Sequence, residues 1–488
     1  MTTKAIEKNK EAVSSLKIFG DLLNGYAARS IGYLASTSAA KAVLTRLDAR
    51  IYKELMSKEQ YPKKVQEEKY FMGRNLILTI LKSLENAKGS PNVQKALVKA
   101  VKNVFLDRKS RVAKFEEKFG HKPPAFLVIG PGKFCNLSCE GCYANSSATN
   151  SEKLEWDVLD RIMEEKEELW GSYFTVITGG EPLLYKSQGK TLLDLAKKHS
   201  GQFFLMFTNG TMIDKAMAKK LQEVGNITPA ISVEGFEKET DARRGEGTHK
   251  KIIEAMANLR EVGVPFGISL TATHNNAELV GGEKLYDYYF GKHGAVYAWI
   301  FQLMPIGRAD SLGLMVDANQ RVKLYRSTQK LAKEKEMFIA DFWNNGCLSD
   351  GCISAGRPGG YLYIEWNGNV TPCVFNPYSP VNINDIYENK KNLNNVLDEP
   401  FFEAIRQWQK DYALDRKPSE MGNWLLPCPI KDHYSDMRKL IDKYKPNPID
   451  EASEQALLDD NYKIGLEKYD REVATASDPI WEKEYLGK

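Results

Sequence analysis

The chain has 488 residues and lacks any apolar run near the ~18 residues that a membrane-spanning helix needs. Its longest uncharged stretch near the start, residues 30–40, is short and rich in small side chains. Neither sign of charge dominates, since 68 basic and 64 acidic residues leave a net charge of +4. These absences exclude a transmembrane segment, and the length favours two or three globular domains.

Cysteine and histidine are also scarce, with seven and six residues. Three of the cysteines, Cys135, Cys139 and Cys142, nevertheless form a C-x3-C-x2-C triplet. A zinc knuckle needs a fourth Cys or His nearby, and none occurs between Tyr143 and Gly179. The odd local count and the lack of a secretory signal argue against disulfides and predict a reducing, cytoplasmic setting. A closed [4Fe–4S] site uses four thiolates, so three leave one iron open, as in catalytic metal sites.

Two predicted strands flank the triplet. Residues 125–130 form a short apolar run that ends in a Gly-Pro-Gly turn, and residues 174–178 form another that ends in Gly179-Gly-Glu-Pro182. The triplet and this loop together resemble the radical SAM superfamily. The resemblance implies that the cysteines hold a [4Fe–4S] cluster and that S-adenosylmethionine (SAM) chelates the open iron. One electron would then cleave SAM to methionine and a 5′-deoxyadenosyl radical.

The resemblance also assigns the Gly-Gly-Glu-Pro loop to the methionine ammonium of SAM. Gly179 and Gly180 allow close backbone approach, and the Glu181 carboxylate suits a cation. The triplet departs from the family pattern in one respect. Many relatives carry an aromatic residue just before the third cysteine, whereas here Gly141 precedes it and Tyr143 follows it. The side chain that packs near the adenine is therefore left open.

Apolar runs and helical stretches alternate from Ala125 to about Glu336, which predicts an α/β fold with a parallel sheet covered by helices. The resemblance implies a six-stranded partial (β/α)6 barrel with functional residues at the C-terminal ends of the strands. The four further strands are expected at 203–210, 227–235, 265–273 and 296–305, and helices at Leu154–Trp170, Ile213–Val224 and Lys250–Val262.

Polar residues occur at these strand ends. Thr208 closes the third strand, and Ser232 and Glu234 close the fourth. The resemblance implies that the fourth-strand residues contact the SAM ribose. It also implies that Arg244, which we prefer over Arg243, meets the SAM carboxylate. The alternative for Arg244 is a solvated loop arginine.

The other four cysteines, Cys347, Cys352, Cys373 and Cys428, all follow the predicted barrel. Four thiolates satisfy one [4Fe–4S] cluster or one zinc ion, and a reduced, metal-free set is a third alternative. Residues 360–366 followed by Asn-Gly predict a hairpin. This region is similar to the SPASM and twitch extensions, which carry auxiliary clusters. A full SPASM domain needs more cysteines than this chain has, so we expect one auxiliary cluster.

The two ends of the chain differ in charge. Residues 1–120 carry 24 basic and 12 acidic residues, a net +12, so the rest carries −8. Helices are expected at Ala40–Met56, Glu67–Glu85 and Asn92–Phe105. Near the other end, Ile480–Tyr485 is expected to dock through its aromatic residues. We divide the chain into a basic helical region (1–120), a radical SAM core (121–340), an auxiliary-cluster region (341–435) and an acidic helical tail (436–488).

The resemblance implies an enzyme that takes a hydrogen atom from an unactivated C–H bond, with an external reductant of flavodoxin or ferredoxin type. A lipid or amphiphile is the favoured substrate, because the basic region could rest on anionic lipid head groups at the membrane periphery. One alternative is a peptide- or protein-modifying enzyme of RiPP or maturase type. Another is a non-catalytic iron–sulfur electron-transfer protein. Nucleic acid is disfavoured, since no RNA-binding motif accompanies the basic region.

Overall fold

The structure is a computed structural model that describes residues 48–488 except 50, 310 and 415. Residues 40–47 of the predicted helix Ala40–Met56 therefore lie outside the described residues. Within the described part, no helix combines the length and the apolar character needed to cross a membrane.

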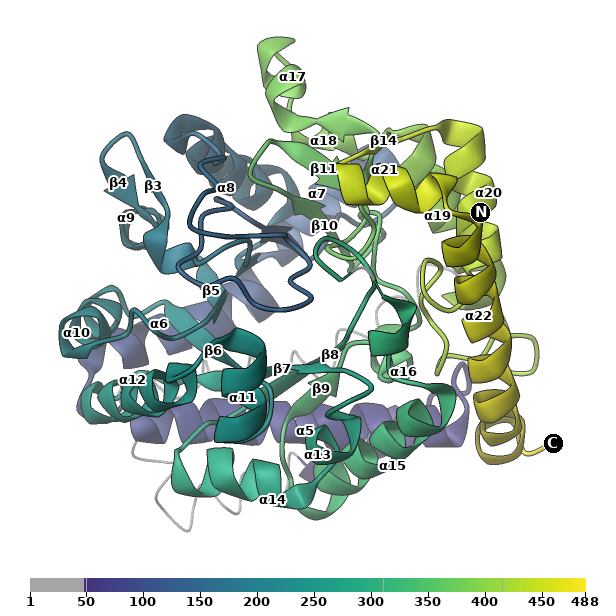
Figure 1. The fold of residues 1–488 in the computed structure, drawn as a ribbon, viewed down its shortest axis with the longest axis horizontal. Helices are drawn as coiled ribbons and strands as arrows, with labels where there is room; N and C mark the ends of the chain where they lie inside the picture. Colours follow the sequence, from purple (N-terminus) through teal and green to yellow (C-terminus); the bar gives the residue numbers. More distant parts are fainter. Residues whose placement is uncertain (1–47, 50, 310, 415) are drawn as a thin grey trace.

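A mostly parallel sheet of ten strands forms the centre of the molecule (Figure 1). The six predicted strands are all present and lie side by side in chain order. The sheet gains a further parallel strand at each side, β9 (Ile339–Asp341) next to β8 and β10 (Tyr361–Ile364) next to β1. The six are β1 (Phe126–Ile129), β2 (Phe174–Ile177), β5 (Phe203–Thr208), β6 (Ile227–Val233), β7 (Gly267–Ala272) and β8 (Ala298–Gln302). The expected α/β fold is confirmed.

The predicted helices between the strands are also present, with small shifts at their starts. They are α8 (Trp156–Trp170), α10 (Lys215–Val224) and α12 (Thr248–Val262). In α10 the start is explained by the Asp214 side chain, which caps the helix by accepting a hydrogen bond from the Met217 amide. Gly225, in a left-handed conformation, ends it.

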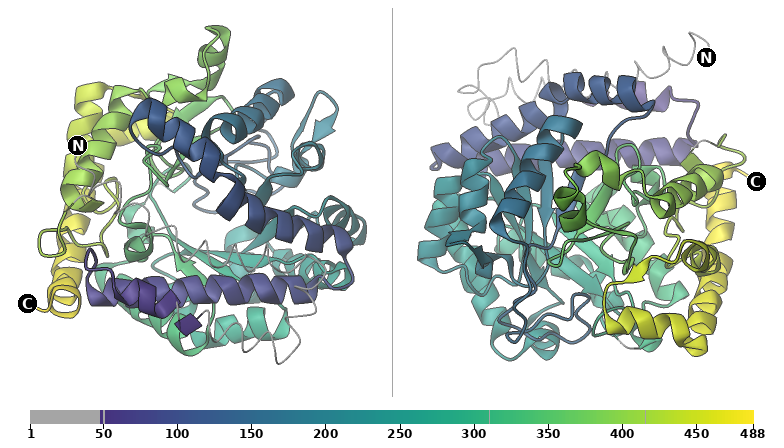
Figure 2. Two further views of the ribbon diagram at one scale, coloured as in Figure 1. Left: turned by 180° about the vertical axis from the view of Figure 1, so that it is seen from behind. Right: turned by 90° about the horizontal axis from the view of Figure 1, so that it is seen from above.

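The N-terminal helices lie along the ends where the strands begin. They are α5 (Lys63–Asn86), α6 (Pro91–Lys102), the π-helical η1 (Asn103–Asp107) and α7 (Lys109–Phe119). Asn75 donates to the Ala332 carbonyl before β9, and Asn103 donates to the Gly201 carbonyl before β5. Leu84, Leu97 and Phe115 belong to the same hydrophobic core as the sheet. Seen from behind, these purple and blue helices cross the molecule (Figure 2). This region is therefore part of the barrel's packing.

The C-terminal part extends the same sheet. Strand β10 and β11 (Asn369–Thr371) form the predicted hairpin around Asn367-Gly368. The chain then ends in α20 (Tyr434–Tyr444), α21 (Glu451–Leu458), α22 (Asp460–Ile480) and the π-helical η6 (Trp481–Leu486). Trp481 and Tyr485 are buried, which confirms that the terminal segment docks through its aromatic residues.

Candidate functional site

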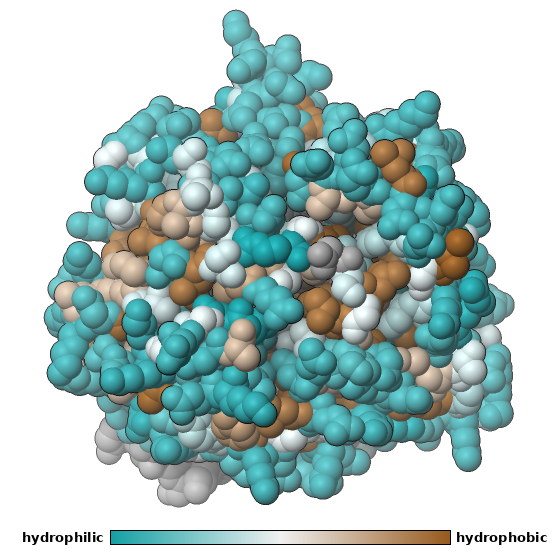
Figure 3. Space-filling model, viewed as in Figure 1, coloured by the Kyte–Doolittle hydropathy of each residue, from teal (hydrophilic) through white to brown (hydrophobic). Residues whose placement is uncertain are grey.

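One cavity of about 710 Å³ lies against one face of the sheet, and six of the seven cysteines line it. Cys135, Cys139 and Cys142 lie on its wall, as do Cys352, Cys373 and Cys428. All seven cysteines of the protein are free. On the face drawn in Figure 3, apolar residues gather around the middle of the molecule inside a hydrophilic rim. The volume lies in the ordinary range for small-molecule sites.

The loop after β1 presents the cysteine triplet. The Cys135 Sγ accepts from the Leu137 amide at 3.4 Å and from the Asn209 Nδ2 at 3.7 Å. Burial, aided by the Glu181 carboxylate and the other two thiols, raises the pKa of Cys135 to about 11. Without metal this thiol holds its proton at neutral pH, so binding of a cluster has to release it.

Glycine at 179 and 180 lets two backbones touch. Gly179 has φ +105°, and a Cβ at Gly180 would lie 2.5 Å from the Lys133 carbonyl oxygen and closer still to that of Phe134. The Gly180 amide donates to the Gly132 carbonyl at 2.9 Å, and the Glu181 amide donates to the Phe134 carbonyl at 2.8 Å. The two glycines thus join the Gly-Gly-Glu-Pro loop to the cysteine loop, and both lie on the cavity wall.

Glu181 lies behind that wall. Its carboxylate accepts from the Thr208 hydroxyl at 2.7 Å, the Asn209 amide at 2.8 Å and the Leu183 amide at 3.1 Å. The side chain is fully buried, and burial raises its pKa. These contacts make Glu181 a brace between the ends of β2 and β5, whereas Thr208 itself reaches the cavity.

Glu234 holds both candidate arginines. Its Oε1 accepts from the Arg243 Nη1 at 2.6 Å and from the Arg244 Nε at 2.8 Å, while its Oε2 is buried without a partner. Arg243 also donates to the Glu140 carbonyl at 3.1 Å, and this hydrogen bond stabilises the cysteine loop. The Arg244 Nη1 lies 4.0 Å from the Cys139 Sγ. Ser232 and both arginines line the cavity, whereas Glu234 supports them from behind.

Tyr143 and Arg308 also fix the cysteine loop. The Tyr143 hydroxyl lies 2.7 Å from the Thr178 hydroxyl and accepts from the Gly179 amide at 3.1 Å. Arg308 donates to the Cys139 carbonyl at 2.9 Å and to the Ser146 carbonyl at 2.5 Å. Sequence reasoning missed Arg308. The sequence gives one indication of its role, because Arg308 directly follows Gly307 in the turn after the sixth predicted strand.

The four C-terminal cysteines separate into three and one. Cys352, Cys373 and Cys428 share the cavity wall, and Cys352 lies close enough to the other two thiols to help raise the pKa of each. Burial raises the pKa of Cys373 to about 12 and that of Cys428 well above its usual value. Cys347 lies apart, fully buried against Glu68 and Tyr485.

No group of three or more His, Cys, Asp or Glu residues in the described ranges is arranged around a single metal ion. Each triplet of thiols instead faces open cavity space, and this arrangement fits an iron–sulfur cluster, which is larger than one ion and takes Cys thiolates as its ligands.

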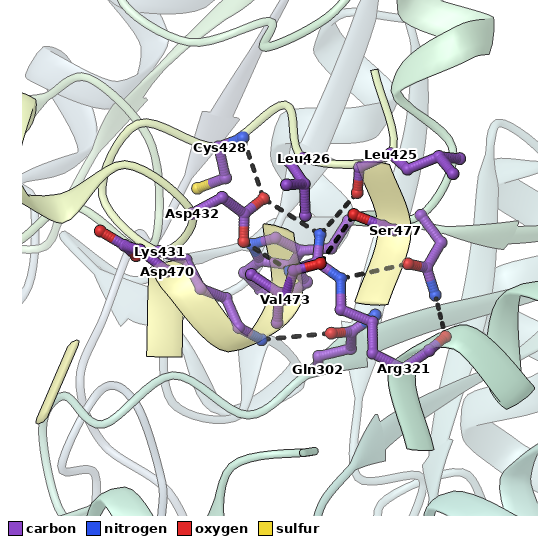
Figure 4. A network of polar contacts seen from close by, with 12 residues as sticks. Gln302, Arg321, Leu425, Leu426, Cys428, Lys431, Asp432, Asp470, Val473 and Ser477 are labelled. Carbon is purple, nitrogen blue, oxygen red and sulfur yellow. Dashed lines mark hydrogen bonds and ion pairs between the residues drawn. The ribbon is translucent and has the colours of Figure 1, made fainter. Parts of the chain in front are cut away.

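A buried polar network anchors the segment that carries Cys428 (Figure 4). Arg321 donates to the Asp432 carboxylate at 2.5 Å and to the Leu425 carbonyl at 2.8 Å, and the Cys428 amide donates to Asp432 at 3.2 Å. The Lys431 Nζ reaches the Gln302 Oε1 at 3.3 Å. Burial, with the nearby Arg321 charge, lowers the pKa of Lys431 to about 7. Breaking such a buried pair by removing one partner costs about 3–5 kcal/mol, so this position of Cys428 is strongly held.

Comparisons with known proteins agree with this geometry. Residues 129–280 match the Radical SAM superfamily, and residues 352–419 match the SPASM domain, an iron–sulfur cluster-binding domain. The chain therefore contains a radical SAM domain followed by a SPASM domain. The radical SAM domain implies SAM and a [4Fe–4S] cluster, and the SPASM domain implies auxiliary iron–sulfur clusters.

Several curated enzymes are similar to this chain. Fe-coproporphyrin III synthase of Methanosarcina barkeri is 31% identical over 162 residues, which are 33% of this chain and 40% of that enzyme. SkfB, the sporulation killing factor maturation protein of Bacillus subtilis, is 25% identical over 49% of this chain and 57% of its own. The cysteine-type anaerobic sulfatase-maturating enzyme of Clostridium perfringens is 26% identical over 52% and 75%. The chain thus spans 40% and 57% of the first two of these relatives.

One solved structure, SuiB of Streptococcus suis bound to the precursor peptide SuiA, has a TM-score of 0.49 at 19% identity. That match covers 62% of this chain and 71% of SuiB.

Proposed function

We propose that this radical SAM enzyme binds a [4Fe–4S] cluster through Cys135, Cys139 and Cys142 and binds SAM in the adjoining cavity. The reaction removes a hydrogen atom from an unactivated C–H bond of a substrate in the same cavity. One observation carries the proposal. The triplet, the Gly179–Gly180 backbone and Arg244 all line a single cavity that continues away from them along the inner face of the sheet.

The bound cluster and SAM supply a 5′-deoxyadenosyl radical, and the protein's part is to bind, orient and exclude water. Gly179 and Gly180 present backbone groups to the methionine end of SAM. Arg244 lies within 4.0 Å of the Cys139 sulfur, held by Glu234, and offers a cation for a carboxylate. Ser232, on the same wall, offers a hydroxyl to a ribose. Glu181 acts through Thr208 and Asn209 as a positioning residue.

The SPASM region holds one auxiliary cluster through Cys352, Cys373 and Cys428 in this proposal. Cys347, an expected fourth ligand, takes no part because it is buried against Glu68 and Tyr485. The Tyr361 side chain lines the cavity and lies near all three thiols. The four-part division at residues 120, 340 and 435 is kept as a proposal about function, and the helices before residue 120 share the hydrophobic core of the sheet.

A lipid or other amphiphile is the substrate class that the cavity supports best, because aromatic and aliphatic side chains dominate its wall. Peptide or protein modification is the second candidate, favoured by the names of the curated relatives SkfB and the sulfatase-maturating enzyme. An external one-electron donor of flavodoxin or ferredoxin type completes the reaction in either case.

Exposed lysines of α6 and α7 could meet an anionic membrane surface, which would place the enzyme at the membrane periphery in the cytoplasm. They are Lys95, Lys99, Lys102, Lys109, Lys114 and Lys118. Since these helices share the core, the test is substitution. Changing Lys109, Lys114 and Lys118 to Glu should abolish co-sedimentation with phosphatidylserine vesicles at low salt. If the unmodified protein does not bind these vesicles, this part of the proposal is wrong.

Deuterium transfer into 5′-deoxyadenosine tests the reaction. Reconstituted, reduced enzyme and SAM are incubated separately with lipid and peptide fractions from fully deuterated cells. We expect deuterated 5′-deoxyadenosine with the lipid fraction. Deuterium with the peptide fraction alone would select the maturase alternative. If cluster-loaded protein forms no 5′-deoxyadenosine at all, the non-catalytic electron-transfer alternative is correct instead.

A further inference from the structure

The cavity extends well past the SAM site. At one end, the cavity is lined by the cysteine triplet and Gly179, which follow the C-terminal ends of the strands. At the other end, it is lined by Phe126 and Phe174, the first residues of β1 and β2, and by Phe338, which precedes β9. At about 3.3 Å per residue, the four residues of β1 alone separate these two ends by roughly 13 Å. The cavity therefore occupies the inside of the sheet along the length of its strands.

Polar side chains of the strands lie mainly at the triplet end of the cavity, although apolar residues such as Phe207 and Phe301 line that end as well. Toward the cysteine triplet, the wall carries Ser232 of β6, Thr271 of β7 and Gln302 of β8, each close to the C-terminal end of its strand. Toward the strand starts, the wall is made mostly by Phe126, Phe174, Trp299, Phe338 and, from helix α5, Met72 and Leu76. Lys69 of α5 also lines this end, but its ammonium group is already bound to the Leu348 carbonyl at 3.0 Å and to Asp350 at 2.8 Å. A ligand that fills this space has a polar end near the triplet and an apolar end against α5.

Helix α5 contributes an unexpected glycine to the apolar end. Gly73 lies inside the 24-residue helix with ordinary helical φ, and it lines the cavity. A Cβ at this position would meet no atom within 4 Å, so close packing does not require glycine. In a helix interior glycine is about fivefold less favourable than alanine. The missing side chain leaves open space at the end of the cavity.

We propose that the apolar end of this cavity, between α5 and the first residues of β1, β2 and β8, binds the hydrocarbon chain of an amphiphilic substrate. The chain runs along the inside of the sheet, and Gly73 provides room for its far end. The polar or reacting part then lies beside the SAM site. The assignment of this ligand as a substrate rests on the proposed function, whereas the binding pocket itself can be tested alone.

The probe is 11-(dansylamino)undecanoic acid, whose fluorescence reports transfer into an apolar site. It is titrated onto the cluster-loaded protein, and saturated carboxylates from C8 to C14, each below its micelle concentration, compete with it. We expect affinity to rise about fourfold per added methylene until the chain fills the pocket, as burial of CH2 groups requires. Binding that does not saturate, or that ignores chain length, would overturn the proposal.

Gly73→Phe fills the far end of the pocket, and we expect it to weaken the longest carboxylates at least tenfold while sparing the shortest. Gly291→Phe is the matched control, because Gly291 is also helical, is exposed and has no atom within 4 Å of its Cβ position. Unchanged binding in Gly73→Phe refutes the pocket. If Gly73→Phe lowers the thermal midpoint, Leu76→Trp on the same wall takes its place.

Formation of unlabelled 5′-deoxyadenosine without substrate separates the two proposals. Gly73→Phe should retain this uncoupled SAM cleavage, since Gly73 lies at the opposite end of the cavity from the triplet. A protein that cleaves SAM but binds no alkyl probe would contradict the pocket alone. A protein that binds the probe with the expected chain-length dependence but forms no 5′-deoxyadenosine would contradict the proposed function alone.

Discussion

The two groups of cysteines reach the same cavity by different routes. Cys135, Cys139 and Cys142 lie on one loop after β1, and that loop is held by hydrogen bonds from Asn209, Arg243 and Arg308, which lie much further along the chain. Cys352, Cys373 and Cys428 come from separate segments of the chain, and the sheet and the Arg321–Asp432 pair help to bring them to the same cavity. A ligand set on one loop is visible as a sequence motif, whereas a set assembled by tertiary structure is not.

The largest expected effect comes from removing one whole group of cysteines and comparing it with removal of the other group. Replacing Cys135, Cys139 and Cys142 together by Ala should remove about four irons per chain and all SAM cleavage, because no thiolate remains at the first cluster. Iron content and 5′-deoxyadenosine formation measure this. The matching change of Cys352, Cys373 and Cys428 should remove the other iron but leave the first cluster. Retained SAM cleavage in the triplet variant would refute the site.

Cys347 and Cys373 sharpen the comparison within the C-terminal group. Cys373→Ser should lose the auxiliary cluster, seen as a loss of about half the iron and of its electron paramagnetic resonance signal. Cys347→Ser should keep the full iron content, because its thiol lies against Glu68 and Tyr485 instead of the cavity. Equal iron loss in both variants would return Cys347 to the ligand set.

Arg244 separates SAM binding from cluster binding at the triplet. Arg244→Gln removes the cation next to Cys139, and we expect SAM affinity to fall about 10–100-fold, the usual worth of a hydrogen bond to a charged group. Iron content should stay unchanged. Equilibrium binding of SAM to the loaded protein measures the effect, and Arg260→Met, an exposed arginine of α12, is the control. Unaltered SAM affinity would make Arg244 a structural residue.

Glu68 tests the assignment of Cys347 to a structural network. Glu68 is buried and accepts from the Tyr325 hydroxyl at 3.2 Å and from Tyr485 of η6. Burial raises its pKa. Between the ordinary pKa of a glutamate and the raised pKa of Glu68, the folded protein therefore binds more protons than the unfolded chain. The free energy of unfolding should fall as the pH rises from the first of these values to the second.

Glu68→Gln should flatten this decline and raise the thermal midpoint at pH 7.5 by about 2 °C. Thermal unfolding at a series of pH values measures it. Glu67→Gln is the matched control, since Glu67 is exposed in the same turn of α5. A decline of equal steepness in Glu68→Gln and in the unmodified protein would show that Glu68 has no part in it.

The sequence by itself determined the six strands, most helices between them, the cysteine triplet and the Gly-Gly-Glu-Pro loop. Each of these depends on residues that are close in the chain, such as the Asp214 cap and Gly225 at the two ends of α10. The role of Gly180 was less accessible, because the backbone that it must approach belongs to the cysteine loop more than forty residues earlier.

Only the tertiary structure decided which C-terminal cysteines share the cavity. Cys347 and Cys352 are close in sequence, but Cys347 lies on the short helix α16 (Gly346–Ser349), which packs against α5 and turns its thiol toward Glu68. The structure also decided that Glu181 and Glu234 brace their neighbours from behind the wall, and that α5 closes the apolar end of the cavity. These outcomes depend on contacts between residues far apart in the chain, which no local spacing encodes.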